Sequence, residues 1–210
     1  MHATWYFDVI SPFAYLHFTQ FHRLPGDLAI DCRPVLFAGL LKHWGTKGPA
    51  ELPAKRVHTY QQCVWFAREL GVPFTMPPRH PFNPLRLLRL LIALGATRER
   101  VGSVLGFVWA DGLDPEHDWP ELCTRLGVAP DTPVIDEPAV KQHLVDNTAE
   151  AVARGVWGVP TFDVNGALFW GLDTLSWMNA FLASPDLFDG PDMRRAATAG
   201  VAAERKIPPP

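Results

Sequence analysis

The chain has 210 residues, of which 48% are hydrophobic, and a formal net charge of −3 at pH 7. This length suits one domain, or one domain with a large insertion, and the acidic balance excludes the basic footprint of a nucleic-acid-binding protein. No segment is long and apolar enough to span a membrane, and the N-terminus lacks the pattern of a signal peptide. We therefore expect a soluble cytoplasmic protein without a membrane or nucleic-acid partner.

The first 36 residues predict a β-α-β unit. An aromatic and β-branched run over about residues 3–10 is typical of a buried strand. A helix is expected from Pro12 to about Arg23, where Pro25-Gly26 ends it. Alternating apolar residues from Leu28 to Leu36 indicate a second strand. This order is the opening of an α/β layer.

Residues 37–137 are expected to form a helical insertion, or lid. Almost every periodic segment there has the period of a helix. The sequence predicts helices over residues 54–70, from Asn83-Pro84 to Gly95, over 101–110 and over 119–126. The second of these has apolar residues on a wide face, so we expect it to be deeply buried.

The α/β pattern returns at Pro138, where a helix is expected to run to about Arg154. Asn165-Gly166 between two short apolar runs predicts a hairpin, and a last helix follows over about 174–182. The sequence therefore predicts an α/β protein with thioredoxin topology. Residues 1–36 and 138–188 would form its discontinuous thioredoxin-like domain, and 189–210 a weakly ordered tail.

The cysteines and histidines predict neither a redox pair nor a metal site. Cys32, Cys63 and Cys123 are isolated, and no C-x-x-C pair occurs, which excludes a dithiol centre and a zinc ribbon. The eight histidines show no H-E-x-x-H or similar spacing. We expect buried or idle thiols and no bound metal.

Ser11 stands at the turn between the first strand and the first helix. A serine before Pro12 is a common helix N-cap, and capping alone explains most such serines. A helix N-terminus also favours an anion, and a hydroxyl there can donate to a thiolate and lower its pKa. Both interpretations stay open. No G-x-S-x-G elbow occurs, which disfavours a serine hydrolase.

Pro160 is expected in a tight turn that enters a strand, a position that suits a cis Val159–Pro160 bond. The proline either only stiffens the loop or leaves the N–H and C=O of Val159 free to pair with an extended, peptide-like ligand. Asp173, just past the hairpin, is either a helix N-cap or a partner for the α-amino group of an amino-acid-like ligand.

Short motifs spread over about residues 5–177 carry a family resemblance. They are Phe7-Asp8, Ser11-Pro12-Phe13-Ala14-Tyr15, Arg33-Pro34-Val35-Leu36, Gly39-Leu40, Pro53-Ala54-Lys55, Gly71-Val72-Pro73-Phe74, Pro77, Asn83, the stretch from Thr148 to Phe162, and Phe169-Trp170-Gly171-Leu172-Asp173. In combination they resemble the 2-hydroxychromene-2-carboxylate isomerases, relatives of kappa-class glutathione transferases in the DsbA-like branch of the thioredoxin superfamily.

The resemblance implies a glutathione-dependent isomerase, acting on 2-hydroxychromene-2-carboxylate in aromatic-compound degradation, and a homodimer. The product would be trans-o-hydroxybenzylidenepyruvate, and glutathione would be regenerated. Ser11 would be catalytic, stabilising the glutathione thiolate. The resemblance further implies that glutathione is bound by Ser11, Thr46, Lys55, Val159, Pro160, Asp173 and Thr174.

Two of these positions depart from the family pattern. The family usually has Asn at the position of Thr46 and often Arg at that of Thr174.

Three other functions compete with the isomerase interpretation. One rival is a kappa-like transferase, which would consume glutathione. Another is a non-catalytic thiol-binding protein. A DsbA-like thiol–disulfide oxidoreductase is disfavoured, because no cysteine pair lies near Ser11.

Overall fold

The computed structural model describes residues 1–203. The chain divides into two compact units, Met1–Leu175 and a second that begins at Ser176. Within the described residues, no helix has the length and apolar character that crossing a membrane would require.

A mixed four-stranded sheet lies in the first unit, with the strand order β2-β1-β3-β4. β1 pairs parallel with β2 and antiparallel with β3, and β3 pairs antiparallel with β4. Both residues of the predicted turn, Asn165 and Gly166, have positive φ angles, 53° and 87°, as a type I′ hairpin requires. The strands are β1 (His2–Phe7), β2 (Ala29–Pro34), β3 (Thr161–Val164) and β4 (Ala167–Trp170).

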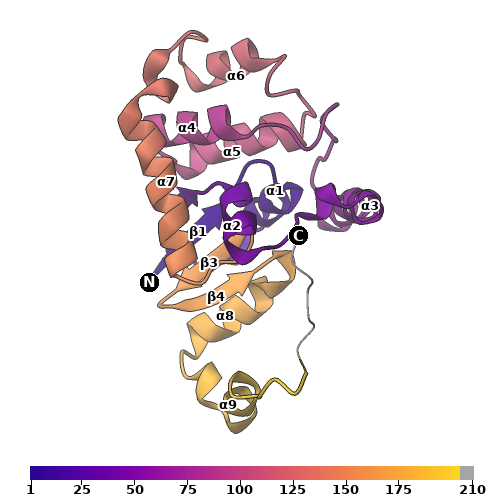
Figure 1. Ribbon diagram of the computed structural model, residues 1–210, viewed down its shortest axis with the longest axis vertical. Coiled ribbons are helices and arrows are strands. Elements are labelled where there is room, and N and C mark those ends of the chain that lie inside the picture. The colour runs from indigo at the N-terminus through magenta and orange to yellow at the C-terminus, as the bar shows by residue number, and fades with distance from the viewer. Residues whose placement is uncertain (204–210) are drawn as a thin grey trace. The chain divides into compact units, whose positions relative to one another are not determined.

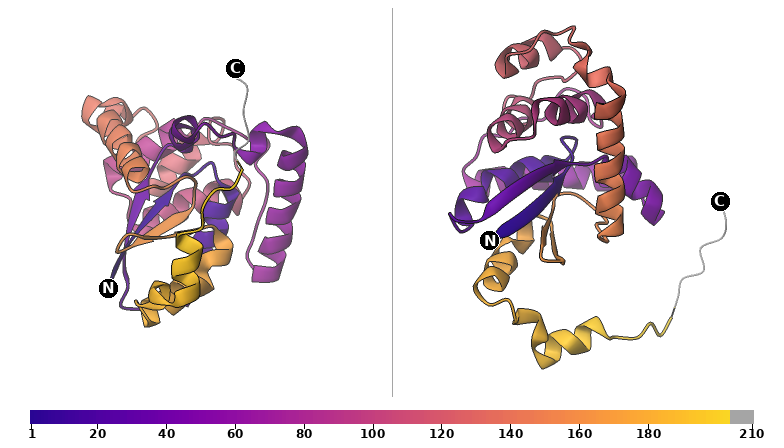
Figure 2. Two further views of the ribbon diagram at one scale, coloured as in Figure 1. Left: turned by 60° about the horizontal axis from the view of Figure 1, so that its bottom comes forward. Right: turned by 90° about the vertical axis from the view of Figure 1, so that its left-hand side faces the viewer.

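Seven α-helices belong to the described first unit. α4, α5 and α6 lie on one side of the sheet, and α7 runs beside them down to the strands, contacting α2, α4 and β2 (Figure 1). α3 lies at the outside of the unit, in contact with α1 (Figure 2). The helices are α1 (Pro12–Thr19), α2 (Phe37–Trp44), α3 (Pro53–Leu70), α4 (Leu85–Leu94), α5 (Arg98–Trp109), α6 (Trp119–Leu126) and α7 (Pro138–Ala153).

Two elements near the N-terminus end earlier than the sequence predicts, and one helix was not predicted. β1 ends at Phe7 rather than near residue 10, because the side chain of Asp8 accepts backbone N–H groups and turns the chain. α1 ends at Thr19, and a 3₁₀ turn follows over Phe21–Arg23. α2 was not predicted as a separate helix. Residues 37–137 hold α2 to α6 and no strand.

Aromatic side chains fill the core on one face of the sheet. Trp5 and Phe7, two residues apart and so on the same face, stack with ring centroids 4.5 Å apart. Phe21 and Phe162 pack against Trp5 at 4.9 and 6.3 Å. The opposite face holds a second cluster, made of Tyr6, Val35, Leu40, Ala151, Val156 and Val159.

The helical layer has a core of its own. Leu87, Leu88, Leu90 and Leu91 of α4 are at most 1% exposed, which confirms the expected deep burial of this helix. Each fully buried leucine contributes roughly 1.5–3 kcal/mol relative to an exposed one. The insertion is therefore a packed layer, which lets it hold fixed positions against the sheet.

The second unit is described by itself. It contains residues from Ser176 of α8 (Leu175–Ala183), a 3₁₀ turn over Leu187–Asp189 and α9 (Pro191–Ala197). The ring of Phe188 lies 5.5 Å from Trp177 and 5.2 Å from Phe181. The segment 189–210, expected as a weakly ordered tail, thus includes α9 in its first part, and residues 204–210 of that prediction lie outside the described residues.

Candidate functional site

Ser11 is the N-cap of α1. Its backbone is extended (φ −88°, ψ 116°), its Oγ accepts the N–H of Ala14 at 3.4 Å, and Pro12 occupies the first helical position. The residue is 8% exposed. The N-cap interpretation is thus confirmed. Because Oγ serves Ala14 only as an acceptor, the hydroxyl proton remains available to donate to a ligand at the helix N-terminus.

The Val159–Pro160 bond is cis. The next residue, Thr161, pairs with Tyr6 near the end of β1, so this loop and the turn that carries Ser11 lie at the same end of these two strands. The Pro160 carbonyl accepts the N–H of Gly171 at 2.9 Å. Thr161 Oγ1 donates to the Gly158 carbonyl at 2.7 Å. These bonds hold the loop from both sides.

The main chain of Val159 has unused hydrogen-bonding capacity. Among residues 1–203, neither its N–H nor its C=O makes a hydrogen bond, although the residue is only 7% exposed. Buried backbone groups without partners are rare in folded proteins. An extended ligand strand can satisfy both groups at once, so this position has the character of a backbone-pairing site.

Gly171 joins the cis-proline loop to Asp173 and Thr174. Besides bonding Pro160, Gly171 accepts the hydroxyl of Thr174 through its carbonyl at 3.0 Å. Its φ is +92°, and a Cβ here would lie 2.9 Å from Asp173 Oδ1. Asp173 is exposed, and its turn, Leu172–Thr174, contacts α1. The structure thus gathers the predicted residues of α1, the cis-proline loop and this turn.

The two predicted site residues of the insertion are not joined to that group. Thr46 and Lys55 are exposed, and no hydrogen bond or ion pair connects their side chains to Ser11 in the described part of the chain. Their elements do approach the site. Trp44 Nε1, near Thr46, donates to the Val156 carbonyl at 2.9 Å, and Lys55 lies in the first turn of α3, which contacts α1.

Asp8, which the sequence analysis named within a motif but not as a site residue, is a fully buried carboxyl three residues before Ser11. Oδ1 accepts the N–H of Ile10 at 3.0 Å, and Oδ2 accepts that of Phe37 at 2.8 Å. Its main-chain carbonyl accepts the N–H of Ser11 at 3.1 Å. Burial raises the pKa of Asp8 to about 7, against the opposing effect of the two backbone bonds. The sequence signal that could have identified Asp8 was its position as a single carboxylate inside an apolar run.

Two rings from the insertion hold the carbonyls of the loop before Ser11. Trp109 Nε1 donates to the Val9 carbonyl at 2.9 Å. His80 lies between the Ile10 carbonyl, 2.8 Å from Nε2, and the Tyr60 hydroxyl, 2.6 Å from Nδ1. A carbonyl only accepts, so Nε2 carries the proton and a neutral ring accepts at Nδ1. Burial lowers the pKa of His80, which favours this neutral form.

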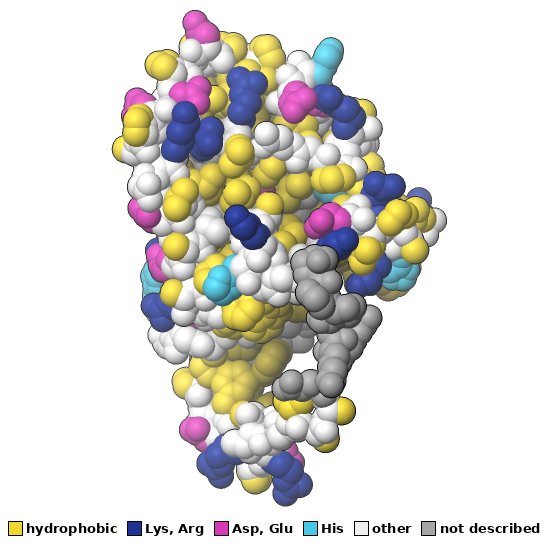
Figure 3. Space-filling model, in the orientation of Figure 1, with side chains coloured by type: hydrophobic (Ala, Val, Ile, Leu, Met, Phe, Trp, Pro, Cys, Tyr) yellow, Lys and Arg dark blue, Asp and Glu magenta, His cyan; other side chains and the backbone are white. Residues whose placement is uncertain are grey.

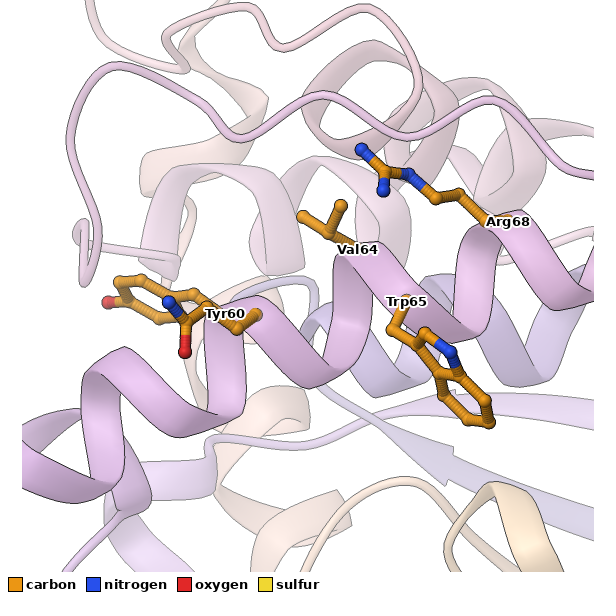
Figure 4. Close-up of a pocket in the computed structure, with 5 residues that line it drawn as sticks. Tyr60, Val64, Trp65 and Arg68 are labelled. Carbon is orange, nitrogen blue, oxygen red and sulfur yellow. The ribbon is translucent and has the colours of Figure 1, made fainter.

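A shallow pocket of about 340 Å³ lies along α3, lined by Tyr60, Gln61, Val64, Trp65 and Arg68. In Figure 4, Val64 and Arg68 project to one side of the helix and Trp65 to the other. None of the predicted site residues lines this pocket. Its contact with the site is indirect, through the hydrogen bond from Tyr60 to His80.

The cysteines are buried, and burial raises the pKa of both Cys32 and Cys63 to about 12. Neither thiol is therefore a ready nucleophile near neutral pH. Within residues 1–203, no group of three or more His, Cys, Asp or Glu side chains is placed to hold a metal ion. Any thiolate at Ser11 has to come from a ligand.

Comparison with known proteins gives relatives that are named either as kappa-class glutathione transferases or as 2-hydroxychromene-2-carboxylate isomerases. Glutathione S-transferase kappa 2 from Caenorhabditis elegans is 28% identical over 210 residues, which cover 89% of this chain and 92% of the relative. The 2-hydroxychromene-2-carboxylate isomerase of Pseudomonas sp. (strain C18) is 28% identical over 181 residues, 81% of this chain and 84% of the relative. The resemblance found from the motifs is thereby confirmed.

The fold comparison agrees with the relatives. A solved structure of selenomethionine 2-hydroxychromene-2-carboxylate isomerase matches with a TM-score of 0.75 and 21% identity, covering 95% of this chain and 100% of that one. The expected α/β, thioredoxin-like fold is thus confirmed. The family model of the DSBA-like thioredoxin domain matches residues 4–183. Since this match spans most of the chain, the protein belongs to the family of DsbA-like thioredoxin domains.

Proposed function

We propose that this protein is a glutathione-dependent isomerase that interconverts 2-hydroxychromene-2-carboxylate and trans-o-hydroxybenzylidenepyruvate. The observation that carries the proposal is the unpaired main chain of the buried residue Val159 beside a cis proline, at the end of the sheet that also carries the N-cap Ser11. The relatives named 2-hydroxychromene-2-carboxylate isomerase support the same reaction. A homodimer and a cytoplasmic location stay predictions.

The residues present fit glutathione, an extended tripeptide-like thiol with a charged γ-glutamyl end. Val159 offers one N–H and one C=O for its cysteinyl main chain, with Pro160 holding that segment. Asp173, exposed next to Thr174, would take the γ-glutamyl ammonium group. Thr46 and Lys55 would contribute from the insertion, Lys55 as a cation for a glutathione carboxylate.

Ser11 is assigned the central chemical role. When bound, glutathione supplies a sulfur nucleophile that adds to the substrate and leaves again, so that it is regenerated. The Ser11 hydroxyl donates a hydrogen bond that favours the ionised sulfur, and the N-terminus of α1 adds its partial positive charge. The protein thus lowers the pKa of a thiol that it does not itself provide.

A kappa-like transferase is the second candidate, because Glutathione S-transferase kappa 2 aligns with 89% of this chain. Both activities use the same thiolate and therefore the same Ser11. They differ in what happens to glutathione: an isomerase returns it, whereas a transferase leaves it attached to the product. Counting free thiol before and after complete conversion of the chromene separates the two.

The test follows substrate absorbance with purified protein, with and without glutathione. We expect conversion only with glutathione and without loss of free thiol. Ser11→Ala should lower turnover by about a hundredfold or more, the usual cost of removing one donor to a developing anion, and should raise the pKa of bound glutathione in ultraviolet titration. Ser103→Ala on α5 is the control. Unchanged turnover in Ser11→Ala would remove Ser11 from the mechanism.

A further inference from the structure

A second cavity, of about 590 Å³, opens between α2, α4 and α7. Its walls are mainly apolar, with Leu36, Leu85 and Leu144 among them, and basic side chains stand at its edge. In Figure 3, hydrophobic side chains gather on the face where these three helices meet, with Lys and Arg side chains beside them. None of the residues assigned to the glutathione site lines this cavity.

Arg89 on α4 lines the cavity with unused donors. Its side chain is only 23% exposed, and its Nε is buried without a hydrogen-bond partner in the described residues. The nearest carboxylate oxygen, Asp136 Oδ1, lies 3.9 Å from the guanidinium. Leaving this buried N–H donor unsatisfied is costly, and the guanidinium has further donors at its two terminal nitrogens. The side chain is therefore poised for an anion that it does not contact here.

The local charges leave a positive excess. Lys141 on α7, also lining the cavity, places Nζ 2.9 Å from Asp136 Oδ1. Arg89 and Lys141 thus share one carboxylate, which is itself 69% exposed. His43 of α2 also lines the cavity. Two cations with one exposed carboxylate between them attract a further negative charge.

We propose that this cavity binds a small amphipathic carboxylate, with an aromatic or branched apolar body. The carboxylate would lie against the planar donor fork of Arg89, which matches its geometry, and Lys141 would add the second cation. The apolar body lies between the leucine side chains. The volume of about 590 Å³ is within the range of ordinary small-molecule sites. This site is separate from the glutathione site and does not depend on the proposed reaction.

The test measures binding of 2-naphthoate to the full chain by isothermal titration calorimetry. Arg89→Met, which keeps the apolar stem, should weaken binding about tenfold or more. Ala149→Phe, which fills the cavity wall, should abolish binding without changing any charge. Lys42→Met is the matched control, because Lys42 is an exposed cation on α2 that does not line the cavity, and it should bind as the parent does.

Four results would contradict the proposal, the last of them only its apolar part. The first is a parent protein that does not bind 2-naphthoate. The second is an affinity for 2-naphthoate that neither Arg89→Met nor Ala149→Phe changes. Thermal melting shows whether each variant is folded. If Arg89→Met is unfolded, the result for Ala149→Phe alone decides. The third is displacement of 2-naphthoate by S-hexylglutathione, which would place the probe in the glutathione site. Inorganic phosphate binding as tightly as 2-naphthoate would refute the apolar part of the assignment.

Discussion

Replacing Asp8 by Asn tests whether the buried carboxyl beside Ser11 makes the stability of the fold depend on pH. Asp8 is completely buried, and no cation lies among the groups that perturb it. Only the N–H groups of Ile10 and Phe37 offset its desolvation. Its proton affinity in the folded protein therefore differs strongly from that in the unfolded chain.

The sign and size follow from the two pKa values. Burial raises the pKa of Asp8 from 3.8 to about 7, so between these pH values the folded protein holds a proton that the unfolded chain has released. Stability then falls as pH rises, because the folded state binds more protons. At about 1.4 kcal/mol for each tenfold difference in proton affinity, the free energy of unfolding drops by about 3 kcal/mol between pH ~4 and pH ~7.

Urea unfolding, followed by tryptophan fluorescence at pH values from about 4 to 8, measures this drop. Asp8→Asn cannot titrate, and its amide NH₂ faces an N–H donor, which costs about 1–3 kcal/mol at every pH. Subtracting the variant's curve from that of the parent removes the contributions of the other titrating groups. Two curves that run parallel over the whole range would refute the assignment of a raised pKa to Asp8.

Two packing predictions concern the loop and the helical layer. Gly158→Ala should lower stability by about 1–3 kcal/mol, because its Cβ would lie 2.7 Å from Trp170 Nε1. Gly26→Ala serves as the control, since its Cβ would have nothing within 4 Å. Equal melting temperatures for the two variants would contradict this contact. Leu88→Ala should cost about 2–5 kcal/mol in urea unfolding, since Leu88 is 0% exposed, against under about 0.5 kcal/mol for Val57→Ala, which is 55% exposed. A Leu88→Ala loss as small as that of Val57→Ala would mean that α4 is loosely packed.

Helices that end at a local stop signal, such as a C-terminal glycine, could be predicted from the sequence. α6 begins at Trp119 and ends at Leu126 as expected, because Gly127 supplies the left-handed cap, with a φ of 69°. α3 ends before Gly71 for the same reason. The end of β1 could not be predicted, since the chain is turned there by a hydrogen bond that the Asp8 carboxylate accepts from the N–H of Phe37, far along the sequence.

In the candidate site too, residues with a local sequence signal could be predicted and residues placed by tertiary contacts could not. Ser11 and Pro160 could be selected because a hydroxyl before a helix and a proline before a strand are local signals. The groups that fix the Ser11 loop could not, because His80 and Trp109 reach it only through tertiary packing. No periodic pattern in the sequence marks a ring nitrogen that is to meet a particular carbonyl. Local reasoning therefore finds the candidate ligand-contacting residues, but not the residues that hold them in place.

The strand order has a consequence for how the chain folds during synthesis. β1 and β2 are made early and pair with each other, but the other edge of β1 pairs with β3, which begins only at Thr161. Until the ribosome has delivered the insertion and the hairpin, β1 keeps an open edge, and open edges recruit foreign strands. Pairings this distant in sequence also form slowly. The emerging chain is thus expected to expose this strand edge until β3 has been made.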